Sequence, residues 1–155
     1  METTVQNFAK AAMLIHKPVA EVFEAFVNPE ITTKIWFTRS SGPLEKGRQL
    51  EWVWEMYGVT VPVFVREVKP CEKIEIEWGN QGEQTLVTWT FSATDSEKTF
   101  VSIVNSGFQG DADQLLASVR DSTEGFTLVL ANLKALLEHG IQLNLVGDRF
   151  PKEMQ

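Results

Sequence analysis

Five short segments in which apolar and polar residues alternate follow one another between residues 50 and 105. They span residues 50–57, 59–69, 74–78, 87–91 and 101–105. A period of two is typical of strands that bury one face, and the tight turns between the segments join antiparallel neighbours. The middle of the chain therefore predicts an antiparallel meander of five strands. Pro62 has no backbone N–H, so we expect an edge or a bulge near the start of the second strand.

The residues before the meander predict one more strand and two short helices. Residues 5–15 alternate in part and end before Pro18, which suits the first turn of a helix that runs to Asn28. A second short helix is expected over residues 30–37. Residues 40–43, Ser-Ser-Gly-Pro, then predict a loop.

A long amphipathic helix is predicted after the meander. Its apolar stripe consists of Leu115, Val119, Phe126, Leu130, Leu133 and Leu137. Asp111 and Asp113 suit the positive end of the helix dipole, and Gly140 suits the C-terminal cap. Gly125, in mid-helix, predicts a bend or a close approach. Because the apolar stripe must be buried against the meander, we expect one α+β domain over residues 1–155, in which a curved antiparallel sheet wraps the helix.

Charge and cysteine content exclude several classes of protein. Lys and Arg number 14 against 21 Asp and Glu, so a net charge of −7 opposes binding to nucleic acid or to an anionic membrane surface. The single cysteine, Cys71, excludes an internal disulfide and a cysteine-based zinc site. No signal peptide and no apolar run of roughly 18 residues is visible, so we expect a cytoplasmic protein without membrane insertion.

The titratable residues form no recognisable catalytic pattern. His16 ends the first predicted strand, and His139 lies at the negative end of the long helix, where a positive charge is favourable. Residues 42–49 have the glycine spacing of a phosphate-binding loop but lack the Lys-Ser/Thr pair that follows its second glycine. We therefore predict no catalytic residue, no metal site and no cofactor, and we favour a non-enzymatic role.

Aromatic side chains crowd the predicted inner face of the sheet. Two interpretations are open, because aromatic residues dominate ordinary cores and also line apolar ligand pockets. We favour a pocket between the sheet and the long helix. Its candidate ligand-binding residues are Trp36, Trp52, Trp54, Met56, Ile76, Trp78, Trp89, Phe91, Ile103, Asn105, Val119, Phe126 and Leu130.

Several polar and terminal residues have more than one interpretation. Asn105 points inward, either as a satisfied strand-end amide or as a group that orients a ligand carbonyl or hydroxyl. Arg66 is expected to form an outward salt bridge. Residues 141–146 are apolar enough to pack back on the domain or on a second copy, which leaves the oligomeric state open. A solvated outer face of the sheet is predicted by Glu51, Glu55, Glu75 and Glu77.

Taken in order along the chain, a set of motifs resembles the helix-grip, or START-like (SRPBCC), superfamily. The motifs are Lys17-Pro18-x-x-Glu21-Val22-Phe23, Trp36, Gly47, Val68-x-Pro70, Ile74-x-Ile76-x-Trp78, Asn105-Ser106-Gly107-Phe108, Gly125-Phe126 and Leu133-Lys134-x-x-Leu137-Glu138-x-Gly140. The closest branch is the activator of heat-shock-protein-90 ATPase homologue. The resemblance implies a sheet that grips a long helix around an apolar cavity. Members of the superfamily include lipid and hormone carriers, polyketide cyclases and chaperone partners, so the fold alone assigns no activity.

Three functional hypotheses follow, in the order in which we favour them. The first is non-catalytic binding of a small apolar ligand that is planar or polycyclic, such as a polyketide, a flavonoid or a lipid. The second is an enzyme of the cyclase or aromatase type that uses the same cavity, with Asn105 assisting. The third is a protein-interaction module of the chaperone-partner or regulatory type, with Glu75 and Glu77 in its docking surface.

Overall fold

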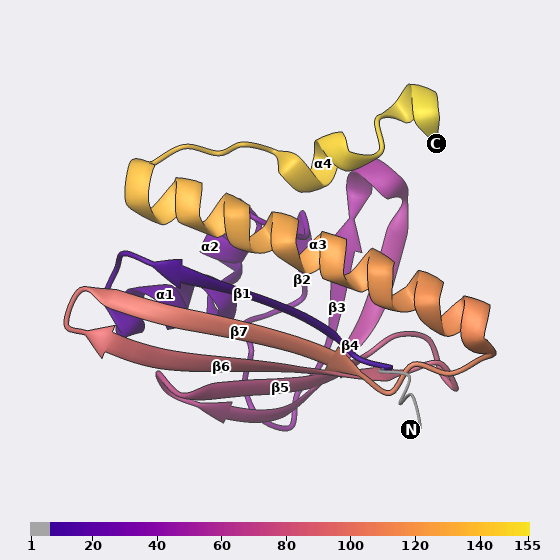
Figure 1. The fold of residues 1–155 in the computed structure, drawn as a ribbon, viewed down its shortest axis with the longest axis horizontal. Coiled ribbons are helices and arrows are strands. Elements are labelled where there is room, and N and C mark those ends of the chain that lie inside the picture. The colour runs from indigo at the N-terminus through magenta and orange to yellow at the C-terminus, as the bar shows by residue number, and fades with distance from the viewer. Residues whose placement is uncertain (1–6) are drawn as a thin grey trace, which may run out of the picture.

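The computed structural model describes residues 7–155, which form a seven-stranded sheet and four α-helices (Figure 1). The strands are β1 (Ala9–Ile15), β2 (Arg39–Ser40), β3 (Gln49–Trp54), β4 (Val59–Lys69), β5 (Lys73–Trp78), β6 (Thr85–Asp95) and β7 (Lys98–Ser106). The helices are α1 (Val19–Val27), α2 (Pro29–Thr32), α3 (Ala112–His139) and α4 (Leu145–Arg149), with two 3₁₀ turns, η1 (Glu55–Tyr57) and η2 (Lys152–Met154).

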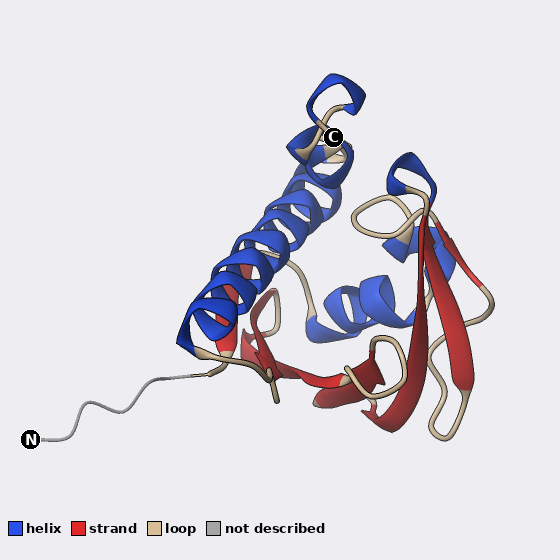
Figure 2. Cartoon of the chain, turned by 90° about the vertical axis from the view of Figure 1, so that its right-hand side faces the viewer, coloured by secondary structure: helices blue, strands red, loops and turns tan. Residues whose placement is uncertain are grey.

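The sheet is antiparallel throughout, in the order β1-β7-β6-β5-β4-β3-β2. The predicted meander is confirmed as β3 to β7, and the first strand returns to the far edge of the sheet beside β7. Figure 2 shows that the sheet is strongly bent, with α3 on one side of the bend and the β3–β4 hairpin on the other. The structure therefore confirms the predicted α+β helix-grip architecture.

The N-terminal elements are shorter than predicted. The first strand begins at Ala9, and residues 5 and 6 of its predicted range lie outside the described part of the chain. The second helix ends at Thr32 instead of residue 37. The helix stops there because the chain turns back toward the sheet, where the Thr38 N–H donates to the Val53 carbonyl oxygen at 2.8 Å.

Two further differences concern the start of the meander. Residues Arg39 and Ser40, predicted as part of a loop and its approach, form the edge strand β2 opposite Val53 and Trp52. Strand β3 ends at Trp54 rather than at residue 57, because residues 55–57 wind into η1 before Gly58 turns the chain with a positive φ of 60°. The strand therefore ends two residues before Met56, and the predicted alternation does not apply to this residue.

Pro62 lies just before the start of the pairing between β4 and β5, and its carbonyl oxygen accepts from the Gly79 N–H at 3.1 Å. It is opposite Glu51 of β3, whereas the pairing with β5 begins at Val63. The missing N–H therefore removes no hydrogen bond from the sheet. The irregularity of β4 lies further along, between Val65 and Glu67, so the predicted bulge is wrong in position.

Helix α3 is continuous for 28 residues and has the predicted ends. Asp111 and Gln114 form a capping box at its start, and Gly140 ends it with a left-handed φ of 66°. The helix runs unbroken through Gly125, and the expected close approach is that of Arg149, whose Nη1 lies 3.3 Å from the place of a Cβ on this glycine.

The two halves of α3 pack differently. The C-terminal half lies against β1, and its side chains are fully buried at Phe126, Leu130 and Leu133, as predicted. In the N-terminal half, Leu115 and Val119 are only half-buried. The apolar stripe is therefore correct for one half of the helix, and the other half rises away from a packed core.

The outer face of the sheet carries the predicted ion pairs. The Arg66 guanidinium lies 3.6 Å from the Glu75 carboxylate and also contacts Glu77, and Lys73 lies 3.5 Å from Glu75. Glu51 is exposed. Within residues 7–155, no helix combines the length and the apolar character needed to cross a membrane.

A half-buried carboxylate joins the end of β1 to α3. Glu138 accepts hydrogen bonds from the His16 backbone N–H at 3.0 Å and from Lys134 Nζ at 2.7 Å, and Lys134 also donates to the Leu14 carbonyl oxygen. Burial raises the pKa of Glu138, but these hydrogen bonds and the nearby positive charge outweigh it, so the pKa lies below the usual glutamate value.

We expect Glu138→Gln to lower the free energy of unfolding by about 1 kcal/mol at pH 7. A carboxylate whose pKa is lowered by folding stabilises the protein above its unfolded pKa, and this contribution is lost as pH falls through the folded pKa. The difference between the variant and the wild type should therefore shrink below about pH 4, as measured by urea unfolding at several pH values. The control is Glu24→Gln on the exposed face of α1, and an equal, pH-independent loss in both variants would contradict the assignment.

Candidate functional site

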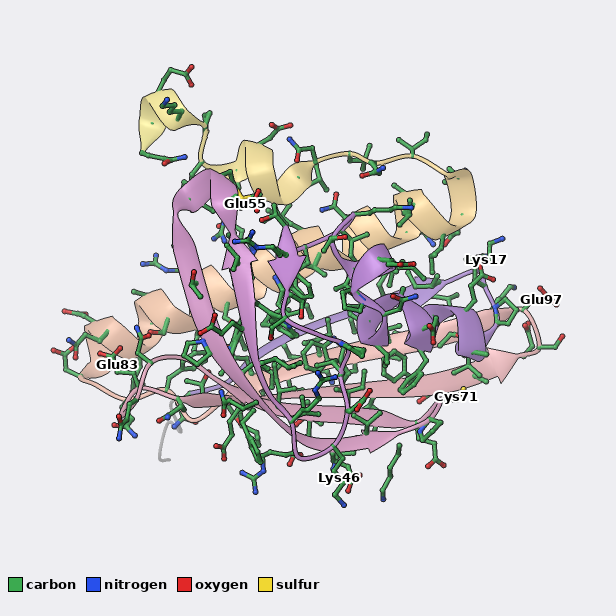
Figure 3. The ribbon with its side chains drawn as sticks, turned by 180° about the vertical axis from the view of Figure 1, so that it is seen from behind. Lys17, Lys46, Glu55, Cys71, Glu83 and Glu97 are labelled. Carbon is green, nitrogen blue, oxygen red and sulfur yellow. The ribbon has the colours of Figure 1, made fainter. Side chains whose placement is uncertain are left out.

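A cavity of about 520 Å³ lies under the N-terminal half of α3. The elements around it are the β3–β4 hairpin with η1, the ends of β5 and β6 with the turn between them, the loop after β7, α3 and the C-terminal tail that contains α4. Figure 3 shows one end of this region, with Glu83 in the β5–β6 turn beside the start of α3 and Glu55 at the tip of the β3–β4 hairpin near α4. The cavity therefore occupies the space that the rising half of α3 leaves above the sheet.

Four aromatic side chains form one wall of the cavity, which we call the aromatic wall: Trp36, Trp54, Trp78 and Phe126. The Trp36 ring centroid lies 5.6 Å from that of Trp78 and 5.5 Å from that of Phe126, and the Trp78 and Phe126 centroids are 5.7 Å apart. Offset and edge-on contacts of this kind hold aromatic rings in fixed orientations. The wall is thus an apolar surface made of flat rings.

Small residues of α3 form the roof of the cavity. Ser118, Ser122 and Gly125 all line it, and their spacing of four and three residues places them on one face of the helix. The larger Val119, on the neighbouring face, does not line the cavity. The helix therefore leaves room for a ligand because the residues turned toward the sheet have short side chains.

A chain of hydrogen bonds joins the ends of β5, β6 and β7 to α3 at the side of the cavity. The Trp78 indole N–H donates to Thr85 Oγ1 at 3.0 Å, and Asn105 Nδ2 donates to the same oxygen at 2.9 Å and to the Leu86 carbonyl oxygen at 2.9 Å. Ser122 Oγ donates to Asn105 Oδ1 at 2.9 Å. Asn105 is thus fully satisfied within the protein, which agrees with the strand-end interpretation of this residue, and its partners Thr85 and Ser122 line the cavity with it.

The C-terminal tail forms the rim on the side of the β3–β4 hairpin. The Tyr57 hydroxyl donates to the Val146 carbonyl oxygen and accepts from the Phe150 N–H at 3.2 Å. Arg149 reaches across α3 to Asp121 at 2.9 Å and Glu124 at 3.0 Å. Within the tail, Val146 packs back on its own chain, whereas Ile141 and Leu143 are exposed.

The structure divides the predicted site residues into three groups. Five of them line the cavity: Trp36, Trp54, Trp78, Asn105 and Phe126. Six are buried in the core behind it and do not line it: Trp52, Ile76, Trp89, Phe91, Ile103 and Leu130. The third group consists of Val119 and Met56. Val119 is on another face of α3, and Met56, in η1, lines a separate cavity of about 80 Å³.

The prediction missed most of the polar and terminal residues of the site. Thr85 and Ser122 are hidden in sequence because each is a small polar residue without a recognisable motif. Tyr57, Arg149 and Phe150 come from η1 and from the tail, which sequence periodicity does not join. One signal was available in the sequence. Small residues recur at helical spacing at positions 118, 122 and 125, beside the apolar stripe of the helix.

The two histidines and Cys71 do not line the cavity. Cys71 lies in the β4–β5 turn at the opposite end of the sheet from Glu83 (Figure 3). Within residues 7–155, no three His, Cys, Asp or Glu side chains come together as a group that could hold a metal ion. The Trp89 indole nitrogen is buried without a hydrogen-bond partner among these residues, and Trp89 does not line the cavity.

A bent antiparallel sheet that grips a long C-terminal helix, with an apolar cavity between them, defines a helix-grip protein. A family model described as "Activator of Hsp90 ATPase homolog 1-like protein" matches residues 16–138. The chain belongs to this family, which confirms the resemblance seen in the sequence. No curated protein matches the chain significantly.

Solved structures with the same fold include two bacterial proteins. Protein SSP2350 from Staphylococcus saprophyticus is 29% identical, with a TM-score of 0.74 over 88% of this chain and 95% of that one. Aha1 from Colwellia psychrerythraea, solved as a dimer in solution, is 16% identical, with a TM-score of 0.74 over 86% of this chain and 97% of that one.

DynU16, described as a putative protein in the dynemicin biosynthetic locus, is a third such structure. It is 20% identical and has a TM-score of 0.78, and the match covers 89% of this chain and 49% of DynU16. At the identities of DynU16 and Aha1, the likeness shows a shared fold.

We expect Tyr57→Phe to loosen the tail without unfolding the domain. The Asp148 N–H, which donates to the Asn144 carbonyl oxygen inside α4, reports on this segment. Loss of the Tyr57 hydroxyl removes two hydrogen bonds to the tail, so amide exchange at Asp148 should become roughly three- to tenfold faster. Amides of β6 in the same sample are the control, and an unchanged rate at Asp148 would show that Tyr57 does not hold the tail.

Proposed function

We propose that this protein binds a small apolar molecule, planar or polycyclic, in the cavity beneath α3, without transforming it. The observation that supports this most is the cavity itself, whose volume of about 520 Å³ lies within the range of about 300–1,000 Å³ typical of small-molecule sites. The aromatic wall offers flat apolar surfaces to such a ligand. The few polar groups beside it would orient the ligand, as is usual in pockets of this kind.

The composition of the lining favours a ring system over a sugar or a phosphate. Trp36, Trp54 and Trp78 present indole rings, which bind other rings by offset or edge-on contact. The only cation among the described lining residues is Arg149, and two carboxylates already neutralise it. A phosphate group would find no free positive charge among these residues.

One experiment distinguishes binding alone from the cyclase or aromatase hypothesis and from the protein-module hypothesis. A ligand that returns chemically unchanged after incubation supports binding alone, and a cyclised or aromatised product supports the enzyme. If none of the apolar compounds tested binds, the interaction module becomes the better hypothesis. The family description, which refers to an activator of Hsp90 ATPase, makes a chaperone the first protein partner to test.

The five tryptophans provide the direct test. In a titration with fatty acids, sterols and planar polyketide-type compounds, we expect saturable shifts of the indole N–H signals of Trp36, Trp54 and Trp78. The signals of Trp52 and Trp89 should move less, because both residues lie behind the cavity. The measurement is a two-dimensional NMR spectrum of protein labelled with ¹⁵N. Shifts confined to Trp52 and Trp89, or spread over the outer face of the sheet, would contradict the proposed site.

A matched pair of helix variants controls for indirect effects. Ser118 lines the cavity, whereas the adjacent Ala117 is exposed and does not. We expect Ser118→Phe to reduce the affinity of a bound compound by about tenfold or more, because the new ring occupies the space of the ligand. Ala117→Phe should leave the affinity unchanged. Equal affinities of the two variants would place the ligand outside the cavity.

A further inference from the structure

The hydrogen bonds of Thr85 leave it only one way to interact with a ligand. Both lone pairs of its hydroxyl oxygen are used, because the Trp78 indole N–H and Asn105 Nδ2 donate to it at 3.0 and 2.9 Å. Neither partner can accept in return, since an indole N–H only donates and Asn105 Nδ2 is identified as the amide nitrogen by its second bond, to the Leu86 carbonyl oxygen. The Thr85 hydroxyl is therefore forced to donate its own proton elsewhere.

No acceptor within residues 7–155 takes that proton. Thr85 forms no hydrogen bond as a donor with the described residues, although it is half-buried and lines the cavity. The other hydroxyl residues of the lining, Tyr57, Ser118 and Ser122, are different: the Tyr57 hydroxyl donates to the Val146 carbonyl oxygen, Ser122 donates to Asn105, and Ser118 has free lone pairs as well as a proton. Thr85 is thus a fixed donor beside the aromatic wall.

The charges around the cavity restrict the ligand further. The lining contains two acidic residues, Glu83 and Asp121, and one basic residue, Arg149. The Arg149 side chain is only 16% exposed and pairs with both Asp121 and Glu124. An anionic ligand would meet surplus negative charge at the rim and no unpaired cation among the described lining residues, so its transfer from water would be unfavourable.

We propose that the cavity selects a neutral planar molecule that carries a carbonyl or similar acceptor oxygen, and that Thr85 Oγ1 donates the hydrogen bond that holds this oxygen. The proposal rests on the proposed binding function and adds two requirements to it. The ligand must offer an acceptor beside Trp78, where Thr85 lines the cavity, and it must not be a carboxylate. Fatty acids in their ionised form are therefore poor ligands, and uncharged aromatic ketones are good ones.

Three probes of nearly equal shape separate these requirements: acetylphenanthrene, isopropenylphenanthrene and phenanthrene carboxylate, all substituted at the same ring position. The first carries a neutral acceptor oxygen, the second has a methylene group in its place and the third is an anion. Affinities are measured by quenching of tryptophan fluorescence, with an indole N–H titration to locate each probe. We expect the ketone to bind about three- to tenfold more tightly than the isopropenyl compound, the range that a neutral hydrogen bond contributes, and the carboxylate to bind most weakly.

Variants of Thr85 test the role of the hydroxyl itself. Thr85→Val should lower the affinity for the ketone by about three- to tenfold and leave the isopropenyl compound unaffected, while Thr85→Ser should retain the preference for the ketone. Thr88→Val is the matched control, because Thr88 is on the same strand with its hydroxyl directed to Glu75 on the outer face. If Thr85→Val does not fold because Trp78 and Asn105 lose their acceptor, the relative affinities of the three probes for the wild type and for Thr85→Ser still test the proposal.

Each outcome has one meaning. If none of the three probes binds, the proposed function fails and the role of Thr85 fails with it. If all three bind the wild type equally, the binding function stands and the selection by Thr85 is overturned. A carboxylate that binds more tightly than the ketone overturns the charge argument. A preference for the ketone that persists in Thr85→Val assigns the acceptor to another donor, such as the Trp36 or Trp54 indole, and also overturns the proposal.

Discussion

The packing of Trp36 joins the parts of this structure that matter for its function. Its ring lies between 4.9 and 6.1 Å, centroid to centroid, from six other aromatic rings, which belong to the same turn, to β3, β5 and β6, and to α3. The turn that carries Trp36 is itself held to α3, because the buried Asn132 amide donates to the Ile35 carbonyl oxygen at 2.9 Å. Trp36 thus contacts both the core and the cavity, and its turn is tied to the C-terminal half of α3. Without it, the aromatic wall would lose its central ring.

The cavity exists because the two halves of α3 carry side chains of different size. From Phe126 to Leu133 the helix contributes large side chains that interlock with β1 and the sheet, and this half fixes the position of the whole helix. Toward the N-terminus the cavity-lining residues Ser118, Ser122 and Gly125 have short side chains, which leave space beside the aromatic wall even though Ser122 reaches Asn105 of β7 at 2.9 Å. A sharp kink toward the sheet would disrupt the backbone hydrogen bonds of this continuous 28-residue helix. The cavity therefore results from the small side chains of the N-terminal half and from the packing that fixes the C-terminal half against the sheet.

The sequence was sufficient for the fold and for the identity of the aromatic face, because both depend on local periodicity. Alternation correctly placed Trp52, Trp54 and Trp78 on the inner side of the sheet, and helical spacing correctly placed Phe126. Periodicity gives the face on which a side chain lies but not its depth along the strand, so it could not separate Trp54 from Trp52. Contacts such as Tyr57 with Val146 join residues 89 positions apart, and only the three-dimensional structure brings them together.

Access to the cavity need not involve the core. The tail at its rim is held by Arg149, whose partners Asp121 and Glu124 have side chains that are 71% and 61% exposed. Because both carboxylates are exposed to water, these ion pairs contribute about 1 kcal/mol each even though the Arg149 side chain is only 16% exposed, and the hydrogen bonds of Tyr57 add an amount of the same order. Displacing this segment therefore requires much less free energy than separating Phe126 or Leu130 from the sheet, where about 2–5 kcal/mol is lost for a single truncated side chain. A ligand can thus enter past the tail while the C-terminal half of α3 keeps the aromatic wall in place.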